Sequence, residues 1–414
     1  MGVSATIEAT PLKHNNAKSI NAASPALRET PATESVSPFT WMELSSQSVR
    51  VETLFNFAAG WTDQDSEAFE PRPLLSLHRA RIWLKGKLTR KLKYVTHFAF
   101  DRIGADQFSL LQGKPGDTNR FPMVQDLLLR YDHAKSGQLR ITGGFFRPFV
   151  GRENASAVIA LPNHDIALTG VLARRGSTGT GHGRATGLNL GGRLQISALK
   201  VIYQAGAFGP TTAGSIDGTD YEQSIGAQGS PLFAGGLTLA FGKPAQLVGA
   251  DYLFLPNPWK DDFGLAFGAS SSVQGETEQF NQSNVYSGFA ALNWSGLFID
   301  GEYVLVARED ASSSVHENSA WHLRAGYNIY LTQSALTPFI LVSELDGGDA
   351  PSSVKLFAGK RRVTDAGVNW HFNRNKLQLG LHAIISEDAS NEAVTPRQPA
   401  REGQSFLMTF QIRH

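Results

Sequence analysis

The chain has 414 residues, a formal net charge of +1 and no cysteine. Disulfide bonds and thiolate metal sites are therefore excluded, and no overall charge is available to attract nucleic acid. The chain contains 25 Phe, 9 Tyr and 7 Trp at a mean hydropathy of −0.19, but no run of about 18 apolar residues that would form a transmembrane helix.

Residues 1–48 are rich in Ala, Ser, Thr, Asn and Pro and show no hydrophobic period. This composition is typical of a flexible arm, and we expect one short helix in it around 38–46. The alternative is a segment that plugs the molecule or binds a partner. The residues that follow Met1 show no basic stretch with an apolar core, so we expect a mature chain from which a signal peptide is absent.

From residue 49 onward, segments of about ten residues alternate apolar and polar side chains. Strands of ~9–11 residues with this period suit lipid on one face and water on the other. We therefore predict an all-β fold, a 16-stranded antiparallel transmembrane β-barrel over 49–414, with the arm 1–48 on the periplasmic side. The expected strands are 49–59, 76–87, 92–101, 124–133, 138–146, 186–195, 197–207, 231–241, 246–255, 284–294, 297–307, 320–330, 335–344, 362–371, 376–386 and 404–413.

Short turns and long loops alternate between these strands, which is the pattern of bacterial outer-membrane barrels. The segment Phe263–Gly268 also alternates. Counting it as a strand would place a long connection on the side of the short turns, so we assign it to the fifth outer loop, 256–283. A soluble β-sandwich is the alternative fold, but eight hairpins with long loops on one side only favour the barrel.

The longest connection, 147–185, is the third outer loop in this count. Against only Glu153 and Asp165, it carries five arginines and two histidines: Arg147, Arg152, Arg174, Arg175, Arg184, His164 and His182. In general porins the third loop folds into the lumen and narrows it, and a ring of Arg or Lys in a pore favours anions. The alternative is a surface loop whose arginines contact the phosphates of lipopolysaccharide.

The strand 76–87 adds further cations to the predicted lumen. Ala80, Ile82 and Leu84 would face lipid, so the period of two sends Arg79, Arg81 and Lys85 to the other side. Arg130 and Arg140 would extend this basic track. Carboxylates should face the lumen as well and pair with some of these cations, so we expect only a mild preference for anions; they are Glu52, Asp126, Asp132, Asp251, Asp300, Glu302 and Asp365.

No pattern in the chain predicts an enzyme. A G-x-S-x-G motif is absent, and His, Asp and Glu do not cluster at metal-ligand spacing. The glycine-rich stretch Gly176–Gly183 lacks the lysine and the strand-to-helix context of a phosphate-binding loop. We therefore expect no catalytic residue, no metal and no cofactor.

The segment 76–149 resembles the phosphate-selective porin O and P family. The matching features are Arg79–Gly86, then Lys93-Tyr94 with Phe98–Asp101, then Leu127–Tyr131, and finally Leu139–Phe149, where a Pro-Phe pair follows a glycine-rich strand. The resemblance implies a sixteen-stranded trimeric outer-membrane channel whose inward loop binds anions such as phosphate. It makes Arg147 and Arg152, at the entry to that loop, the first candidates for anion binding.

We therefore expect an outer-membrane porin for passive diffusion of small hydrophilic solutes, with a mild preference for anions such as phosphate. The expected partners are these solutes, outer-membrane lipid, lipopolysaccharide and two further copies of the chain, but no nucleic acid. The alternative is a structural barrel that anchors a surface or envelope assembly through its loops or its N-terminal arm.

Overall fold

The computed structural model describes residues 40–44, 47–64, 72–100, 123–133, 137–156, 161–178, 183–209, 229–242, 247–248, 253–254, 263–277, 280–348, 356–357, 359–372, 376–388 and 403–413. The chain divides into two compact units, Met1–Pro38 and Phe39–His414, and the first of these lies outside the described residues. None of the described helices has the length and apolarity needed to span a bilayer.

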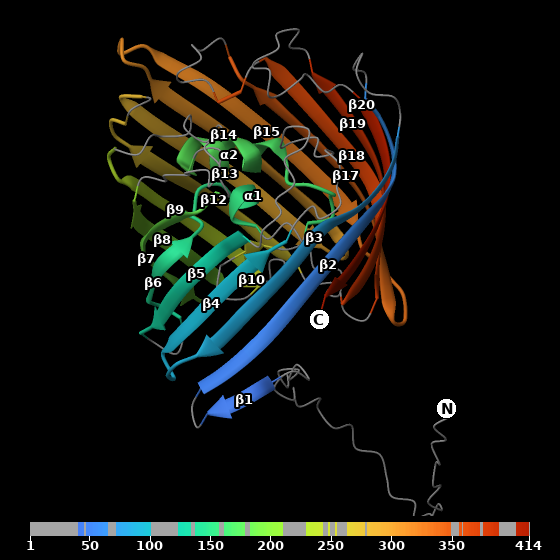
Figure 1. Cartoon of the computed structure of the whole chain (residues 1–414), viewed down its shortest axis with the longest axis horizontal. Coiled ribbons are helices and arrows are strands. Elements are labelled where there is room, and N and C mark those ends of the chain that lie inside the picture. Colours follow the sequence, from blue (N-terminus) through green and yellow to red (C-terminus); the bar gives the residue numbers. More distant parts are fainter. Residues whose placement is uncertain are drawn as a thin grey trace, which may run out of the picture. The chain divides into compact units, whose positions relative to one another are not determined.

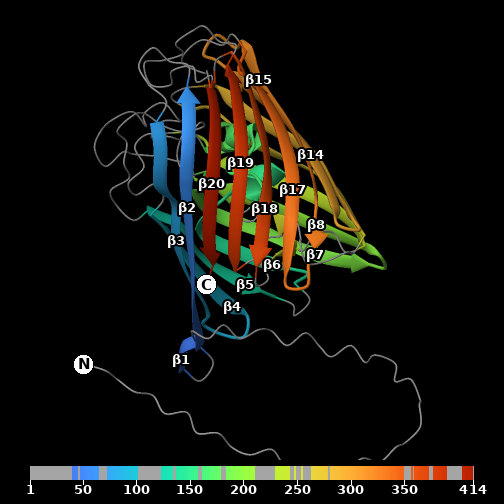
Figure 2. The same cartoon turned by 90° about the vertical axis from the view of Figure 1, so that its right-hand side faces the viewer.

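Within the described residues, sixteen strands form the wall of an antiparallel barrel, which closes because β2 pairs with β20. Figures 1 and 2 show this wall from two sides. The predicted sixteen-stranded antiparallel barrel is confirmed. Its strands are β2 (Gln47–Gln64), β3 (Arg72–Lys87), β4 (Leu92–Ala99), β5 (Met123–Asp132), β6 (Arg140–Phe146), β7 (Ala185–Ile196), β8 (Leu199–Phe208), β9 (Leu232–Gly242), β12 (Gly264–Gln274), β13 (Gln282–Trp294), β14 (Leu297–Glu309), β15 (Val315–Tyr327), β17 (Ser334–Asp346), β18 (Lys360–Phe372), β19 (Leu377–Asp388) and β20 (Gly403–Arg413).

Two short strands extend this sheet. β16 (Ile329–Tyr330) continues β15 along β17, and β1 (Thr40–Leu44) pairs with the first residues of β2. The helix expected around 38–46 is therefore wrong. Because β20 reaches β2 only from Leu54 onward, the start of β2 has a free edge, and β1 covers part of it with backbone hydrogen bonds.

The ninth wall strand differs from the prediction. It is β12, which pairs with β9 on one side and β13 on the other, and it includes the segment that we assigned to a loop. The predicted strand 246–255 contains only β10 (Leu247–Val248) and β11 (Leu253–Phe254), which pair with each other. The count of sixteen holds, but the connection 243–263 on the turn side is longer than the loop 275–281.

The two faces of the wall follow the period of two. On β15, Trp321, Leu323 and Tyr327 point outward and are 38%, 53% and 48% exposed, whereas His322 and Arg324 point inward and are buried. This is the arrangement that alternation predicts for strands between lipid and a polar interior. The barrel therefore carries its polar and charged groups on the inside.

The third loop runs inside the barrel, where Figure 1 shows its two helices, α1 (Arg152–Ala155) and α2 (Leu168–Thr178). α2 lies against the inner face of β13, β14, β15 and β17. Its Leu172 and Val171 belong to one buried apolar cluster with Val285, Val304 and Val306. Burial of these side chains removes apolar surface from the water of the lumen, which fastens the loop to the wall.

Candidate functional site

The start of the third loop is held by Glu302 on β14. The carboxylate of Glu302 accepts hydrogen bonds from the backbone N–H groups of Arg152 (2.5 Å) and Glu153 (2.9 Å) and from the hydroxyl of Ser287 (2.6 Å). Gly151 has a φ of 78°, and a Cβ there would lie 3.1 Å from Glu302 Oε1. Glycine is therefore required at this position, both for the left-handed backbone and for the close approach of the loop to the wall.

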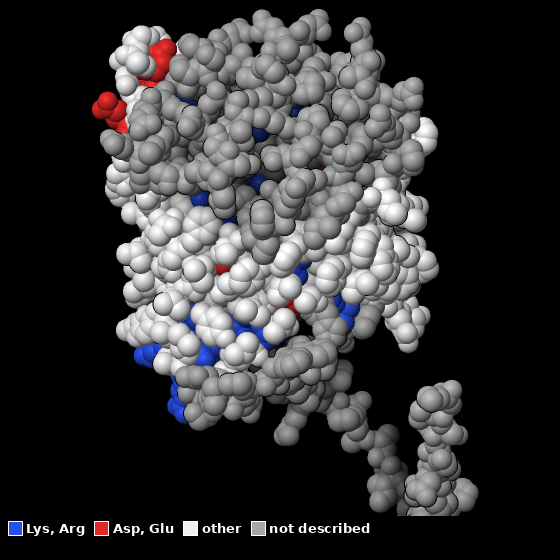
Figure 3. Space-filling view, viewed as in Figure 1, with Lys and Arg blue, Asp and Glu red and all other residues white. Residues whose placement is uncertain are grey.

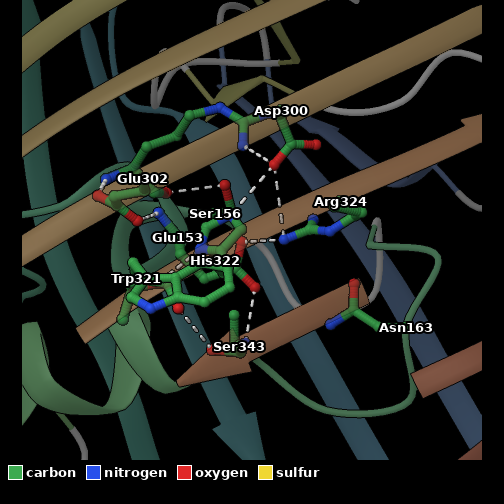
Figure 4. A network of polar contacts seen from close by, with 12 residues as sticks. Glu153, Ser156, Asn163, Asp300, Glu302, Trp321, His322, Arg324 and Ser343 are labelled. Atoms are coloured by element: carbon green, nitrogen blue, oxygen red, sulfur yellow. Dashed lines mark hydrogen bonds and ion pairs between the residues drawn. The ribbon is translucent and has the colours of Figure 1, made fainter. Parts of the chain in front are cut away.

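A second set of contacts neutralises charge between α1 and the wall, as Figure 4 shows. Arg152 donates to Asp300 (2.8 Å), and Arg324 donates to Glu153 (2.5 Å) and lies 3.7 Å from Asp300. His322 Nε2 is 3.2 Å from the same Asp300 oxygen. All five side chains are buried. Arg152 therefore has a buried carboxylate partner, and these residues position the loop.

A cluster of four guanidinium groups lies on another part of the lumen. Arg81 from β3 and Arg147, Arg174 and Arg184 from the third loop are close enough to affect one another electrostatically. The carboxylate of Asp126 on β5 is 3.2 Å from Arg184 Nε. We call Arg81, Arg147, Arg174 and Arg184 the arginine cluster. It brings together three of the predicted site residues, and Arg184 from the same loop joins them.

The arginine cluster contains more positive than negative charge. Burial, followed by the guanidinium groups of Arg184 and Arg174, lowers the pKa of Arg147. Burial, followed by Arg184 and Arg81, lowers the pKa of Arg174 to about 9. Guanidinium groups keep their proton at neutral pH. Burial is the larger cause of the lowered pKa values, and repulsion between neighbouring guanidinium groups adds to it. An anion between these groups would relieve that repulsion.

Arg147 also supports the backbone of its own loop, because it donates to the carbonyl oxygens of Asn154 and Ser156, the latter at 3.0 Å. Replacing Arg147 would therefore change loop conformation as well as charge. The same holds for Arg152, which pairs with Asp300. Arg174 is a cleaner probe of the arginine cluster, because Arg184 and Arg81 act on its guanidinium group electrostatically.

The remaining predicted site residues lie outside the arginine cluster. Arg79 binds Asp165 and the carbonyl oxygen of His164, each at 2.8 Å, and Arg175 lies over the Phe357 ring, 4.3 Å from its centroid. Three residues on the β3–β6 wall complete the set: Lys85 pairs with Glu52 (2.8 Å), Arg140 pairs with Asp132 (2.7 Å), and Arg130 is buried.

Two groups of described side chains gather possible metal ligands within 4.8 Å of one another: Glu153, Asp300 and His322, and His78, His164 and Asp165. In the first group the carboxylates already pair with Arg152 and Arg324. In the second group the Asp165 carboxylate forms an ion pair with Arg79. Both groups therefore act as polar contacts between the loop and the wall.

The apolar contact that docks α2 was not predicted from the sequence. A signal was present in β14, where Tyr303-Val304-Leu305-Val306 is apolar at four successive positions. A strand between lipid and a watery lumen needs apolar side chains at every second position only. An uninterrupted apolar run indicates a strand that is covered on both faces, and Val304 and Val306 are indeed fully buried.

The family model of the phosphate-selective porins O and P matches residues 51–414 of this chain. The resemblance proposed from 76–149 is thereby confirmed and extends over the whole barrel. No curated relative matches the sequence.

Among solved structures, the outer membrane channel DcaP of Acinetobacter baumannii is similar at a TM-score of 0.54 and 11% identity, over 91% of this chain and 99% of that chain. The anion-selective porin from Comamonas acidovorans is similar at 0.51 and 11% identity, over 89% and 99%. Salmonella typhi OmpF in complex with daunomycin is similar at 0.50 and 10% identity, over 89% and 98%. At these identities the likeness shows a shared barrel fold.

Proposed function

The chain belongs to the phosphate-selective porin O and P family, and from this premise we propose that its outer-membrane channel passes small anions, phosphate among them, in preference to cations. The observation that carries the proposal is the arginine cluster, in which four guanidinium groups from β3 and the third loop lie close enough to repel one another, with the carboxylate of Asp126 beside Arg184. Rings of arginine in a pore favour anions because their donors replace part of the ion's hydration shell.

The geometry of guanidinium groups suits a phosphate in particular. Each group presents a planar fork of N–H donors that matches two oxygens of a phosphate or carboxylate. The half-buried position of Arg174, near Arg81 and Arg184, lowers the dielectric screening between these groups and a bound anion. Binding would nevertheless stay weak enough for release, because the anion passes from one cation to the next along the lumen.

We propose that the preference for anions is mild. Much of the basic track along β3 and its neighbours is balanced by carboxylates on adjacent strands: Glu52 pairs with Lys85, and Asp132 pairs with Arg140 and Lys93. Such pairs cancel most of their field at a distance. The guanidinium groups of the arginine cluster instead lie beside one another, so selectivity should depend on the residues of this cluster.

The test is a phosphate titration of chloride current through single channels in a planar bilayer at pH 7.5. Phosphate should reduce chloride conductance in the wild type, because it occupies the arginine cluster for longer than chloride does. Arg174→Gln should weaken this block several-fold. The matched control is Arg175→Gln, a change at the next residue of α2, whose side chain lies over Phe357. Phosphate should block the chloride current of this variant as strongly as that of the wild type.

Equal phosphate block in the wild type and in Arg174→Gln would contradict the role of the arginine cluster.

We also propose assembly as a homotrimer and contact of the outer loops with lipopolysaccharide. The mass of the detergent-solubilised protein before and after heating tests the homotrimer. A mass equal to that of a single chain before heating would contradict it. Retention of lipopolysaccharide through purification tests the second.

A further inference from the structure

Three histidines meet where the third loop crosses to the far wall. His164 of the loop stacks on His78 of β3, with ring centroids 4.2 Å apart and planes 28° apart. The ring of His382 on β19 lies 5.7 Å from that of His164 in an edge-on arrangement. All three imidazoles are buried. We call His78, His164 and His382 the histidine clasp.

The backbone around His164 is fastened to two strands, β18 and β3. Its N–H donates to Asp365 of β18 (2.8 Å), and its carbonyl oxygen accepts from Arg79 of β3 (2.8 Å). Two residues earlier, the carbonyl oxygen of Pro162 accepts from Asn369 (2.6 Å). Asp365 also lies 3.2 Å from Nδ1 of His382. The loop is therefore held to this part of the wall by polar contacts, in contrast to the apolar contacts of α2.

The charges that face His164 come from every element around it. β3 contributes Arg79 and His78, the loop contributes Asp165, β18 contributes Asp365 and β19 contributes His382. With neutral imidazoles, one guanidinium and two carboxylates give a net charge of −1. With three imidazolium ions the same group carries +2, and two of the positive rings would be stacked face to face.

We propose that the histidine clasp is a pH-sensitive fastening of the third loop, which releases the loop from β3, β18 and β19 when the medium becomes acidic. Protonation places like charges at contact distance in a buried site, next to Arg79. Histidine is the side chain whose charge changes in the range of pH 5 to 8, and protonation of histidine clusters is a recognised way to open an interface. Release of the loop widens the lumen.

The direction of the pH effect follows from linkage. Burial, then the neighbouring His78, lowers the pKa of His164 well below its usual value of 6.5. The fastened state therefore binds fewer protons than the released state, in which the imidazole is exposed. Between the lowered pKa and about 6.5, a fall in pH stabilises the state that binds more protons. Acid therefore favours release, and neutral or alkaline pH favours the fastened loop.

The experiment uses the channel activity on which this inference rests. Unitary conductance in a planar bilayer is recorded at pH 7.5 and at pH 5.0 for the wild type and for His78→Gln/His164→Gln. Glutamine keeps hydrogen-bonding capacity but cannot be protonated. The wild type should show a reversible rise in conductance, with added fluctuations, at pH 5.0. The double variant should lose most of this change. The single variants His78→Gln and His164→Gln should each lose part of it.

The matched control is His316→Gln, which removes a histidine at the start of β15, far along the strand from the clasp, where it contacts Asp310 of the β14–β15 loop. It should respond to acid as the wild type does. A conductance that is independent of pH, or a double variant that keeps the full response, would overturn the histidine clasp. Channel insertion at pH 7.5 reports folding of each variant, and phosphate block at that pH tests the proposed function separately.

Discussion

At the scale of single residues, the interior of the barrel shows two uses of arginine. Arg152 and Arg324 are buried beside Asp300 and Glu153, so they position the loop and their charges are balanced. Arg174 and Arg147 lie among other guanidinium groups, so part of their charge is available to a solute. The sequence predicted that arginines of this loop face the lumen. It could not separate the two roles, because the partners of Arg152 lie about 150 positions away on β14.

Arg324→Met should destabilise the barrel, because it leaves the buried carboxylates of Glu153 and Asp300 without their partner. Breaking a buried ion pair by removing one member costs about 3–5 kcal/mol, so the midpoint of urea unfolding in detergent should fall clearly. The control is Lys360→Ala, which removes an exposed pair with Asp346 and should change stability by about 0–1 kcal/mol. Equal midpoints for Arg324→Met and the wild type would contradict the assignment of Arg324 as a buried partner.

At the scale of elements, helix α2 determines how the loop occupies the lumen. Its apolar residues cover Val304 and Val306, which would otherwise face water. Gly176 permits the close approach, since a Cβ at this position would lie 2.7 Å from Val306 Cγ2. The helix is therefore docked on this part of the wall by the hydrophobic effect.

Leu172→Ala should loosen this docking. Leu172 is fully buried, and truncation of a buried leucine costs about 2–5 kcal/mol. We expect added noise in the open-channel current and faster proteolysis of the loop 147–185. Leu323→Ala, on the lipid-facing side of β15, is the control and should leave both unchanged. If Leu172→Ala shows wild-type noise in the open-channel current and a wild-type rate of loop proteolysis, α2 is held by other contacts.

The period of two predicted fifteen of the wall strands within a few residues of their observed ends, because a wall between lipid and water must alternate. The ninth strand was assigned wrongly because we weighed loop length above side-chain period. β12 obeys the period, with Phe267 and Val273 exposed and Ser270 and Ser272 buried. Loop length is the weaker guide, since a long connection such as 243–263 can form short strands of its own.

At the scale of the whole molecule, charge is distributed unevenly along the barrel. On the face that Figure 3 draws, Lys and Arg gather at the lower left edge and Asp and Glu at the upper left edge, with residues of both signs between them. Lys87, Arg90 and Lys91, at the turn between β3 and β4, are exposed there. The net charge of +1 hides this separation. The sequence predicted the basic track, whereas the contacts of the arginine cluster depend on how the third loop folds back, which no local pattern encodes.

If the arginine cluster makes this channel prefer anions, the preference will appear in the reversal potential of the wild-type channel across a KCl gradient at pH 7.5. We expect a potential of the sign set by chloride, smaller than that of an ideally anion-selective membrane because paired carboxylates also line the lumen. A potential of the sign set by potassium would contradict it.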